Sequence, residues 1–290
     1  KGKKVAVLGI GISNTPLIKY LAKLGVSVTA FDQADRTALA PTLESLKGLD
    51  VEYCLGENYL DKLIGFDVIF KTPKVRFDIP PLLKEAEAGA LITSEMEVFC
   101  NLCPARIFGV TGSDGKTTTT TLIYEILKNH GYKCWLGGNI GTPLLDRIDE
   151  IGEDDMVVLE LSSFQLHTMH NRIHTAVVTN LSPNHLDVHK SMQEYADAKK
   201  NIFLYQHKND TVVLNYDNEI TKSFASEAPG RVILFSRTNA IDDGMTVENG
   251  RIVYKRAGEE IEIMDVDDIF LPGAHNVENY LAAASATIDF

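Results

Sequence analysis

The sequence has few cysteines and no long apolar run. Its 290 residues include four cysteines, too few and too scattered for the disulfide framework of a small secreted protein. No apolar run approaches the roughly 18 residues that a membrane helix needs. The short apolar stretch after Lys1-Gly-Lys-Lys carries glycines at turn spacing and is read as a first strand rather than a signal peptide. We therefore expect a cytoplasmic protein without membrane insertion.

Positive charge is also scarce. There are 28 Lys and Arg residues against 40 Asp and Glu, which gives a formal net charge of −12. This balance argues against nucleic acid or an anionic membrane as the main partner, but it allows a local site for one anionic small molecule. The length predicts two domains, and the hydrophobic content of 44% is ordinary for a soluble globular protein.

Short apolar runs alternate with amphipathic stretches, which predicts α/β domains with parallel sheets. In residues 1–103 the expected strands are Val5–Leu8, Val26–Phe31, Val68–Phe70 and Ala90–Thr93, with a helix at Pro16–Leu24. In residues 104–290 the expected strands are Arg106–Val110, Lys133–Leu136, Met156–Leu161, Thr175–Thr179, Thr211–Leu214 and Val232–Phe235. Helices are expected at Lys116–His130 and from Asn276 onward. Asn249-Gly250, between two alternating runs, predicts a small β-hairpin.

The strongest chemical signal is Gly109-Val-Thr-Gly-Ser-Asp-Gly-Lys-Thr117, between an expected strand and an expected helix. Glycines let backbone N–H groups converge on phosphate oxygens, and the helix N-terminus adds its positive end. A lysine then neutralises phosphate charge, and a hydroxyl holds Mg²⁺. The strict phosphate-loop spacing would place a glycine at Val110, so the match is near rather than formal. The alternative is a glycine turn before an amphipathic helix; the order of elements favours nucleotide binding.

A second signal is Glu160, at the end of an apolar strand. Ligands of open α/β sheets bind at the carboxyl ends of strands, so an acid beside a phosphate loop is placed to hold the metal of ATP. The alternative is a solvated acid at a strand end. Together with the phosphate loop, the position favours a metal ligand.

Other clusters carry weaker signals. Cys100 and Cys103 have C-x-x-C spacing, which fits a redox motif, half a zinc site or, as we favour, two reduced cysteines. His185 and His189 could suggest a zinc pair, but Pro183 puts them in a loop without a further ligand. Three histidines are interpreted as packing or surface residues: His167, His170 and His174. The physics of the sequence alone indicates two solvated lysines at 199 and 200.

The first domain has a fingerprint of its own. Gly9 and Gly11 follow the first strand and open a helix, and Asp32 stands at the tip of the next strand, where an acid meets a ribose. Asn14 occupies the place of the third glycine. The pattern supports a Rossmann-like nucleotide site and leaves redox dinucleotide binding open as a weaker hypothesis.

These motifs, in this order, resemble the Mur ligase family along essentially the whole chain. The string Glu160-Leu-Ser-Ser-Phe-Gln165 is similar to that of the D-glutamate-adding members. The resemblance implies two doubly wound domains: a Rossmann-like UDP-binding domain at 1–103, and a central phosphate-loop ATPase domain with a small β-hairpin at 104–290. It further implies a C-terminal amino-acid-binding domain that is absent from this chain.

The resemblance also implies the reaction and its participants. ATP and Mg²⁺ would serve the addition of D-glutamate to UDP-N-acetylmuramoyl-L-alanine through an acyl phosphate, in the peptidoglycan synthesis of a dividing bacterial cell. The protein is expected to be a monomer. Because the third domain is absent, the chain alone is expected to bind nucleotide weakly and not to ligate. The alternative is a non-catalytic nucleotide or UDP-sugar binding module.

Residue roles follow from the same resemblance. The catalytic residues would be Lys116, Glu160, His185 and Lys199. The nucleotide would be bound by Gly112, Ser113, Asp114, Gly115, Lys116, Thr117, Thr118, Asn276 and Asn279. The metal ligands would be Thr117, Glu160, His185 and a carbamylated Lys199, which leaves Lys200 as a solvated neighbour. The UDP substrate would be bound by Ile12, Ser13, Asp32, Gln33, Asn139 and His185.

The sequence departs from the family pattern at three places. Asn184 stands where the family has aspartate, and Asn14 replaces a glycine. Lys74, in Thr72-Pro73-Lys74, stands where a glycine near the UDP is usual. A lysine there would either add a contact to the diphosphate or block the approach of the loop.

Overall fold

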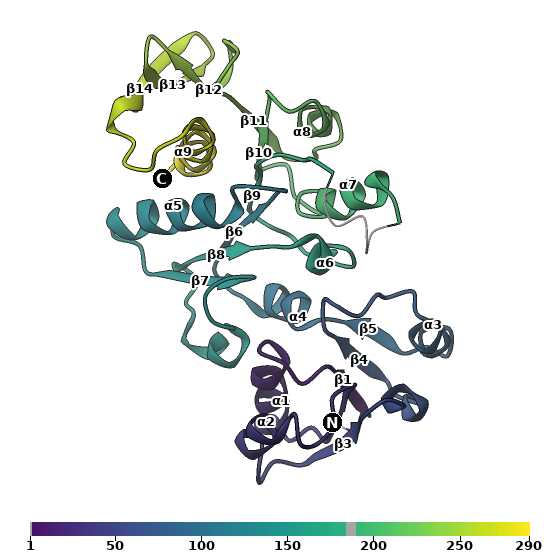
Figure 1. Ribbon diagram of the computed structural model, residues 1–290. Coiled ribbons are helices and arrows are strands. Elements are labelled where there is room, and N and C mark those ends of the chain that lie inside the picture. Colours follow the sequence, from purple (N-terminus) through teal and green to yellow (C-terminus); the bar gives the residue numbers. More distant parts are fainter. Residues whose placement is uncertain (1, 184–189) are drawn as a thin grey trace. The chain divides into compact units, whose positions relative to one another are not determined.

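The computed structural model describes residues 2–183 and 190–290 and contains two compact units (Figure 1). One unit comprises the residues up to Leu102 together with Pro143–Glu150, and the other comprises Cys103–Thr142 and Ile151–Phe290. Each unit is built on its own sheet. The expected α/β class with parallel sheets is confirmed.

The first unit is a five-stranded parallel sheet in the order β3-β2-β1-β4-β5. Its strands are β1 Val5–Leu8, β2 Val28–Asp32, β3 Val51–Leu55, β4 Val68–Lys71 and β5 Leu91–Thr93. Its helices are α1 Asn14–Lys23, α2 Ala40–Ser45, α3 Pro80–Glu87 and α4 Glu95–Leu102, with the 3₁₀ turns η1 Tyr59–Lys62 and η2 Leu145–Glu150. Because β1 leads to β2 on one side and β4 lies on its other side, the order of the strands reverses between β1 and β4. Such a switch point opens a ligand crevice at the carboxyl ends of the strands.

The segment Pro143–Glu150 packs in the first unit, where η2 contacts α1 and α4. Glu95, at the start of α4, is 6% exposed, and its Oε1 atom has no hydrogen-bond partner among the described residues. Burial, together with the charge of the nearby Asp146 carboxylate, raises the pKa of Glu95 to about 7. The Glu95 carboxyl is therefore a partly protonated group near neutral pH.

The second unit is a nine-stranded sheet in the order β14-β13-β12-β11-β10-β9-β6-β8-β7. Its strands are β6 Arg106–Thr111, β7 Cys134–Gly138, β8 Met156–Glu160, β9 Thr175–Val178, β10 Thr211–Asn215, β11 Arg231–Ser236, β12 Gly244–Glu248, β13 Arg251–Arg256 and β14 Glu259–Asp265. Its helices are α5 Lys116–Asn129, α6 Ser163–Leu166, α7 Met192–Lys200, α8 Glu219–Ser223 and α9 Ala274–Thr287, with 3₁₀ turns η3 Phe224–Ser226 and η4 Val266–Asp268.

Helices cover both faces of the second sheet: α5 and α9 lie together on one face, and α6, α7 and α8 lie on the other (Figure 1). The core under α5 and α9 includes Phe108, Ile123, Val158, Val177 and Leu281, all buried. This packing fixes the first turn of α5 against the carboxyl ends of the central strands.

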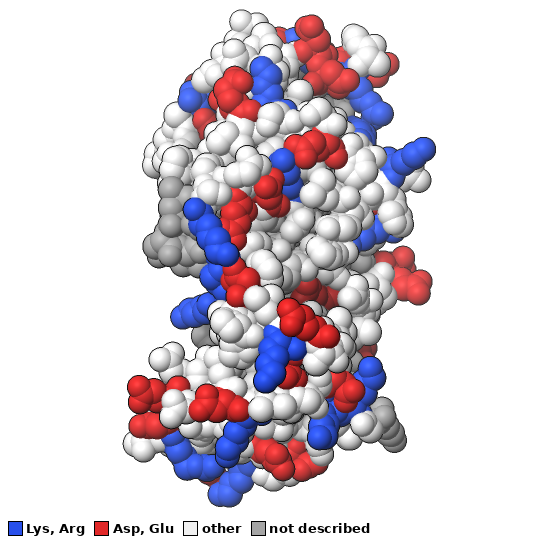
Figure 2. Space-filling view, turned by 90° about the vertical axis from the view of Figure 1, so that its right-hand side faces the viewer, with Lys and Arg blue, Asp and Glu red and all other residues white. Residues whose placement is uncertain are grey.

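Strands β12, β13 and β14 form the antiparallel extension of the second sheet. The expected hairpin is present, with Asn249 and Gly250 both at positive φ in its turn. A second turn at Ala257 and Gly258, also at positive φ, leads into β14. No helix in the described residues is long and apolar enough to cross a membrane. On the face shown in Figure 2, basic and acidic side chains are interspersed.

Candidate functional site

The phosphate loop joins β6 to α5 at the carboxyl edge of the second sheet. Gly112 has φ 152° and Gly115, the residue before the helix, has φ 78°. A Cβ atom at Gly112 would lie 1.9 Å from Thr179 Oγ1, so the close approach of β9 requires glycine there. The first N–H groups of an α-helix have no partner within the helix. The N-terminus of α5 therefore offers donors and a positive dipole end to an anion.

The end of β9 holds the loop in place. Asn180 accepts from Ser113 N through its backbone oxygen at 2.9 Å and from Asp114 N through Oδ1 at 3.0 Å. Thr179 Oγ1 donates to Asp114 O at 2.6 Å. These contacts leave the amides at the start of α5 as the part of the loop available to a ligand.

Glu160 lies at the end of β8, beside the loop. Its Oε2 accepts from Thr117 Oγ1 at 2.7 Å and its Oε1 accepts from Asn139 Nδ2 at 2.8 Å. The residue is 2% exposed. The pairing of β6 with β8 brings Glu160 into register with Val110, which places the carboxylate next to the loop. Thus three predicted site residues, Thr117, Glu160 and Asn139, are brought together.

These oxygens suit Mg²⁺. Among the described residues there is no group of three or more His, Cys, Asp or Glu side chains that could hold a metal ion. Mg²⁺ on a nucleotide is commonly bound by one or two protein oxygens together with phosphate oxygens and water. The hydroxyl of Thr117 and the carboxylate of Glu160 provide such a pair. His185, which we predicted to bind metal and substrate, lies outside the described residues.

Two lysines lie near the Glu160 carboxylate. Lys116 Nζ donates to Gly112 O at 3.0 Å and to Ser113 O at 2.8 Å. Burial lowers the pKa of Lys116, and the charge of Glu160 opposes this shift. The side chain lies against its own loop.

Lys199 is 1% exposed, so the expectation of a solvated lysine from sequence physics is wrong here. Its Nζ donates to Thr111 Oγ1 at 3.1 Å and to Gly112 O at 2.9 Å, and lies 4.8 Å from the centre of the Tyr195 ring. Burial, together with the charge of Lys116, lowers the pKa of Lys199 to about 7 against the opposing charge of Glu160. A neutral amine is therefore accessible near neutral pH.

Lys200 is not the solvated neighbour that we expected. Its Nζ lies 2.7 Å from Glu227 Oε1 and 3.4 Å from Asp197 Oδ1, and its side chain is 14% exposed. It lies on the side of α7 away from Lys199 because the helical repeat of 3.6 residues turns neighbouring side chains by about 100°.

The hydroxyl of Ser113 joins the loop to α7. It donates to Ser182 O at 3.1 Å and accepts from Ser182 N at 3.0 Å. Tyr195 OH lies 3.1 Å away. When the single hydroxyl hydrogen of Ser113 is donated to Ser182 O, Tyr195 is the donor in this pair.

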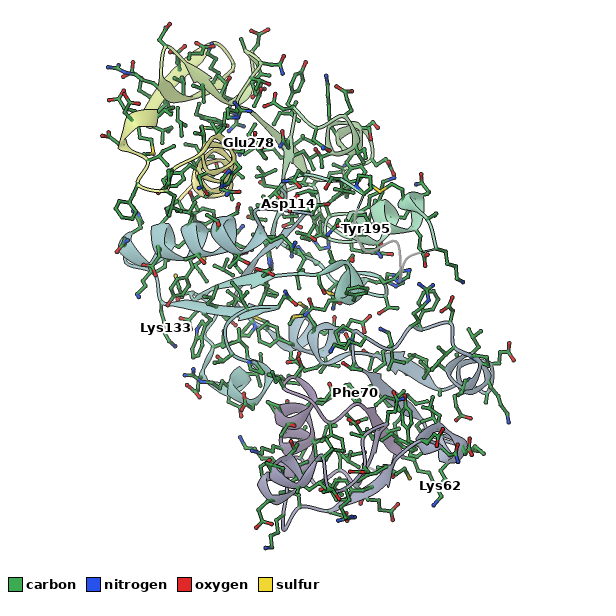
Figure 3. All side chains as sticks on the ribbon, viewed as in Figure 1. Lys62, Phe70, Asp114, Lys133, Tyr195 and Glu278 are labelled. Atoms are coloured by element: carbon green, nitrogen blue, oxygen red, sulfur yellow. The ribbon has the colours of Figure 1, made fainter. Side chains whose placement is uncertain are left out.

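A pocket of about 370 Å³ lies next to the loop, lined by Asp114, Gly115, Thr179, Asn180, Phe235, His275, Glu278 and Asn279. In Figure 3, Asp114 from the loop and Glu278 from α9 mark its two sides, with Tyr195 from α7 nearby. Asn279 Oδ1 accepts from Thr119 Oγ1 at 3.2 Å. Asn276 Nδ2 donates to Pro272 O at 2.8 Å, which places Asn276 at the base of α9 rather than in the lining. The pocket continues from the phosphate loop, as a site for a nucleoside would.

The candidate substrate residues of the first unit surround the turn after β1. Asp32 Oδ2 accepts from Ile10 N at 2.7 Å, and its Oδ1 accepts from Ala34 N at 2.8 Å. Ile12 is 85% exposed, Gln33 is exposed, and Ser13 makes no side-chain capping bond to α1. These residues frame the carboxyl end of β1 and β2.

Asn14 explains the missing third glycine. Its buried Nδ2 donates to Leu8 O at 2.9 Å and to Gly9 O at 3.0 Å. The side-chain amide of Asn14 thus links the first turn of α1 to the end of β1. In the usual pattern a glycine at this position lets the helix and the strand pack closely. Lys74 is exposed on the turn after β4, and its effect on a diphosphate stays a prediction.

Some residues of the site were not predicted from the sequence. Thr111 lies inside the phosphate-loop string but was given no role, whereas Thr179, Phe235 and Glu278 carry no motif of their own. The pairing of strands and the packing of α9 bring these residues to the loop. One partial signal was available: Thr111, Thr179 and Phe235 stand at or just beyond the end of an expected strand, and Glu278 directly precedes the predicted site residue Asn279.

In the comparison with known proteins, two family models match this chain, each over one part of it. The Mur ligase middle domain matches residues 110–287, and the Mur ligase MurD-like N-terminal domain matches residues 3–94. The UDP-N-acetylmuramoylalanine–D-glutamate ligase of Acetivibrio thermocellus is 62% identical over 289 residues, which is 100% of this chain and 62% of that protein. The ligase of the same name from Ruminiclostridium cellulolyticum is 60% identical over 290 residues, again 100% of this chain and 62% of that protein.

Solved structures share the fold. The UDP-N-acetylmuramate:L-alanyl-γ-D-glutamyl-meso-diaminopimelate ligase of Neisseria meningitidis superposes with a TM-score of 0.64 at 18% identity, over 99% of this chain and 93% of that one. The UDP-N-acetylmuramate–alanine ligase of Thermotoga maritima gives 0.53 at 22% identity, over 99% of this chain and 65% of that one. At such identities the similarity concerns the fold alone.

Proposed function

This chain belongs to the Mur ligase family, and from that premise we propose that it is the nucleotide- and substrate-binding part of an ATP-dependent ligase that adds D-glutamate to UDP-N-acetylmuramoyl-L-alanine. The name of the relatives at 62% and 60% identity supports this substrate pair. The observation that carries the proposal is the hydrogen-bonded set of Thr117, Glu160 and Asn139 beside the phosphate loop. The chain spans 62% of the length of each relative, so turnover is proposed for the longer protein.

The proposed reaction has two steps. A carboxylate oxygen of the UDP substrate attacks the γ-phosphorus of ATP, the bond to the β-γ bridging oxygen breaks, and an acyl phosphate and ADP form. The amine of D-glutamate then attacks the acyl carbon, loses a proton, and phosphate leaves. Neither step requires a covalent bond to the protein, so alignment and stabilisation of charge supply the rate.

Each residue of the loop region has a role in this proposal. The amides at the start of α5 and the Lys116 ammonium bind the transferring phosphoryl oxygens. Thr117 and Glu160 hold Mg²⁺, which when bound neutralises phosphate charge and polarises the oxygens. Asn139 fixes the Glu160 carboxylate and contacts the UDP substrate. Lys199, as its carbamate, and His185 orient a second metal ion.

The remaining assignments concern the two nucleotides. We propose that Asn279 and the pocket beside Gly115 bind the nucleoside of ATP, with Asn276 supporting the start of α9. Ile12, Ser13, Asp32 and Gln33 would bind the UDP group in the first unit. The four cysteines are free thiols. We propose that the protein is a cytoplasmic monomer.

A phosphate-release assay tests the function. The full-length gene product, given ATP, Mg²⁺, UDP-N-acetylmuramoyl-L-alanine and D-glutamate, is expected to release phosphate and form the amide product. Lys116→Ala should lower turnover at least 100-fold, while Lys128→Ala, at the other end of α5, should not. Chelation of Mg²⁺ should stop release.

Two results would reject the proposal. Equal activity with another amino acid would remove the D-glutamate assignment. Binding of nucleotide without turnover, unchanged by Lys116→Ala, would favour a non-catalytic binding module. The 290-residue chain alone is expected to bind nucleotide weakly and to form no amide, and product from it would contradict that expectation.

A further inference from the structure

Lys71, the last residue of β4, is a buried cation that no role described above uses. It is 3% exposed. Within the described part of the chain, no side chain or backbone oxygen accepts a hydrogen bond from its ammonium, and no carboxylate forms an ion pair with it. Phe70, labelled in Figure 3, directly precedes it on the strand. Most of the Lys71 side chain is thus removed from water while its ammonium has no partner of opposite charge among the residues that the structure describes, and such an arrangement is rare.

One carboxylate acts on Lys71 from a distance. Burial lowers the pKa of Lys71, and the charge of Glu97 on α4 raises it. Glu97 itself accepts from Thr93 Oγ1 at 3.1 Å. The electrostatic influence of Glu97 favours the ammonium form of Lys71, but it supplies no direct hydrogen-bond acceptor for it.

The position of Lys71 is the switch point of the first sheet. Lys71 is in register with Leu8, the last residue of β1, and Thr72 N donates to Leu8 O at 3.1 Å. A Cβ atom at Gly9 would lie 3.0 Å from Thr72 Cγ2, so the turns after β1 and β4 are in contact. Ligands of open α/β sheets bind in the crevice at this place, where the chain departs to opposite sides.

The surroundings favour an anion. The N-terminus of α1 follows the turn after β1, and the first turn of α1 contains no acidic residue. The Asp32 carboxylate is already occupied by the backbone amides of Ile10 and Ala34. The N-terminus of α1 and Lys71 at the end of β4 therefore both stand at the carboxyl edge of the sheet, where the crevice opens.

We infer that Lys71 is a further substrate-binding residue, whose ammonium binds the diphosphate of the uridine nucleotide. The inference rests on the proposed function for the identity of the nucleotide. Lys71 is distinct from Lys74, which stands three residues later on the same turn and is exposed to solvent. An exposed lysine exchanges water for the anion and gains little binding free energy. The largely desolvated ammonium of Lys71 would gain a hydrogen-bond partner that the fold does not provide.

Binding measurements on the chain separate the phosphate contact from general damage. Calorimetry would compare UDP-N-acetylmuramoyl-L-alanine, UDP, pyrophosphate and uridine on wild type, Lys71→Met, Lys74→Met and Lys84→Met. We expect Lys71→Met to weaken the three phosphate-bearing ligands about 10- to 100-fold, as loss of a charge-assisted hydrogen bond does. Uridine binding and ATP binding should stay within about twofold. Lys84→Met, at an exposed lysine of α3, should resemble wild type for all ligands, and Lys74→Met tests the competing contact from that lysine.

Kinetics of the full-length gene product supply the second readout. Lys71→Met should raise KM for the UDP substrate by a similar factor and leave KM for ATP unchanged. An unchanged KM for the UDP substrate, or an equal loss of uridine and UDP binding, would overturn the inference. If only Lys74→Met weakened the binding of the phosphate-bearing ligands, the contact to the diphosphate would belong to Lys74 instead.

The two hypotheses fail in different ways. If wild type turns over its substrates and Lys71→Met does so with unchanged constants, the inference is wrong and the proposed function stands. If wild type shows no turnover but Lys71→Met loses pyrophosphate binding, the anion site stands and the proposed function is wrong.

Discussion

Replacement of Thr111 by valine tests how the fold positions Lys199. Thr111 is fully buried at the end of β6. Its Oγ1 donates to Leu161 O at 2.7 Å and accepts from Lys199 Nζ at 3.1 Å. Valine has nearly the same shape but no hydroxyl, so the substitution removes both hydrogen bonds and leaves their buried partners without them.

The magnitude follows from burial. A buried polar group left without its partner costs about 1–3 kcal/mol. The Leu161 carbonyl loses its hydroxyl donor and Lys199 keeps one acceptor, Gly112 O. We therefore expect a loss of about 3 kcal/mol in the free energy of unfolding. For a unit of this size, that corresponds to a fall in Tm of roughly 6–12 °C.

Thermal unfolding followed by circular dichroism measures this change, and Thr111→Ser is the matched control. Serine keeps the hydroxyl and loses one methyl group, so its cost is about 1 kcal/mol. Turnover of the full-length gene product should fall with valine more than with serine, because only valine removes the hydrogen bond between Lys199 and residue 111. A valine variant that melts like wild type, or a serine variant that falls as far, would refute the reasoning.

Three further predictions concern other parts of the chain. Glu95→Gln should stabilise the first unit by up to about 3 kcal/mol at pH 8. The folded wild type binds a proton that the unfolded chain has lost between the unfolded pKa of 4.5 and the folded pKa of about 7, so its stability falls as pH rises through this window. Urea titrations should therefore show that the stability gained by the variant decreases towards pH 5. Gly115→Ala places a Cβ atom 2.2 Å from Asn279 Oδ1 and should weaken ATP binding about tenfold in calorimetry, whereas Gly25→Ala, at a similar φ with nothing within 4 Å, should not. Asn14→Gly, which restores the third glycine, should destabilise the first unit in urea by about 2 kcal/mol, and equal stability would show that its two hydrogen bonds contribute nothing.

Much of the second unit could be predicted because its signals are local. The strand before the phosphate loop, the helix after it and the acid at the end of β8 each follow from a few adjacent residues. Their convergence also follows, since the carboxyl ends of parallel strands meet at one edge. The turn at Asn249-Gly250 is equally local, because few residue pairs adopt positive φ at both positions.

Other features depend on contacts that are distant in sequence. Strand β3, Val51–Leu55, was not predicted because it lies at the edge of the sheet and only partly buries its side chains. The strand β14 follows Ala257, a residue with no preference for the positive φ that it adopts. The packing of Pro143–Glu150 in the first unit has no local signal at all.

The environment of Lys199 shows the same limit. Its neighbours on α7 include Asp197 and Lys200, and such a charged stretch is typical of a solvated helix face. Burial results from contacts with Thr111 and Gly112, which precede it by 88 and 87 residues. Only the resemblance to a family indicated a role for this lysine, and His185, predicted in the same way, lies outside the described residues.

The amide of Asn14 has a consequence for how such folds are recognised. A search that demands three glycines after the first strand would pass over this chain, although its strand order is that of a dinucleotide-binding fold. The residue at the third-glycine position has to allow the helix to pack closely against the strand. It does so either because it is small or because its side chain hydrogen-bonds to the strand. Sequences with asparagine there should be searched for nucleotide-binding units in the same way as sequences with glycine.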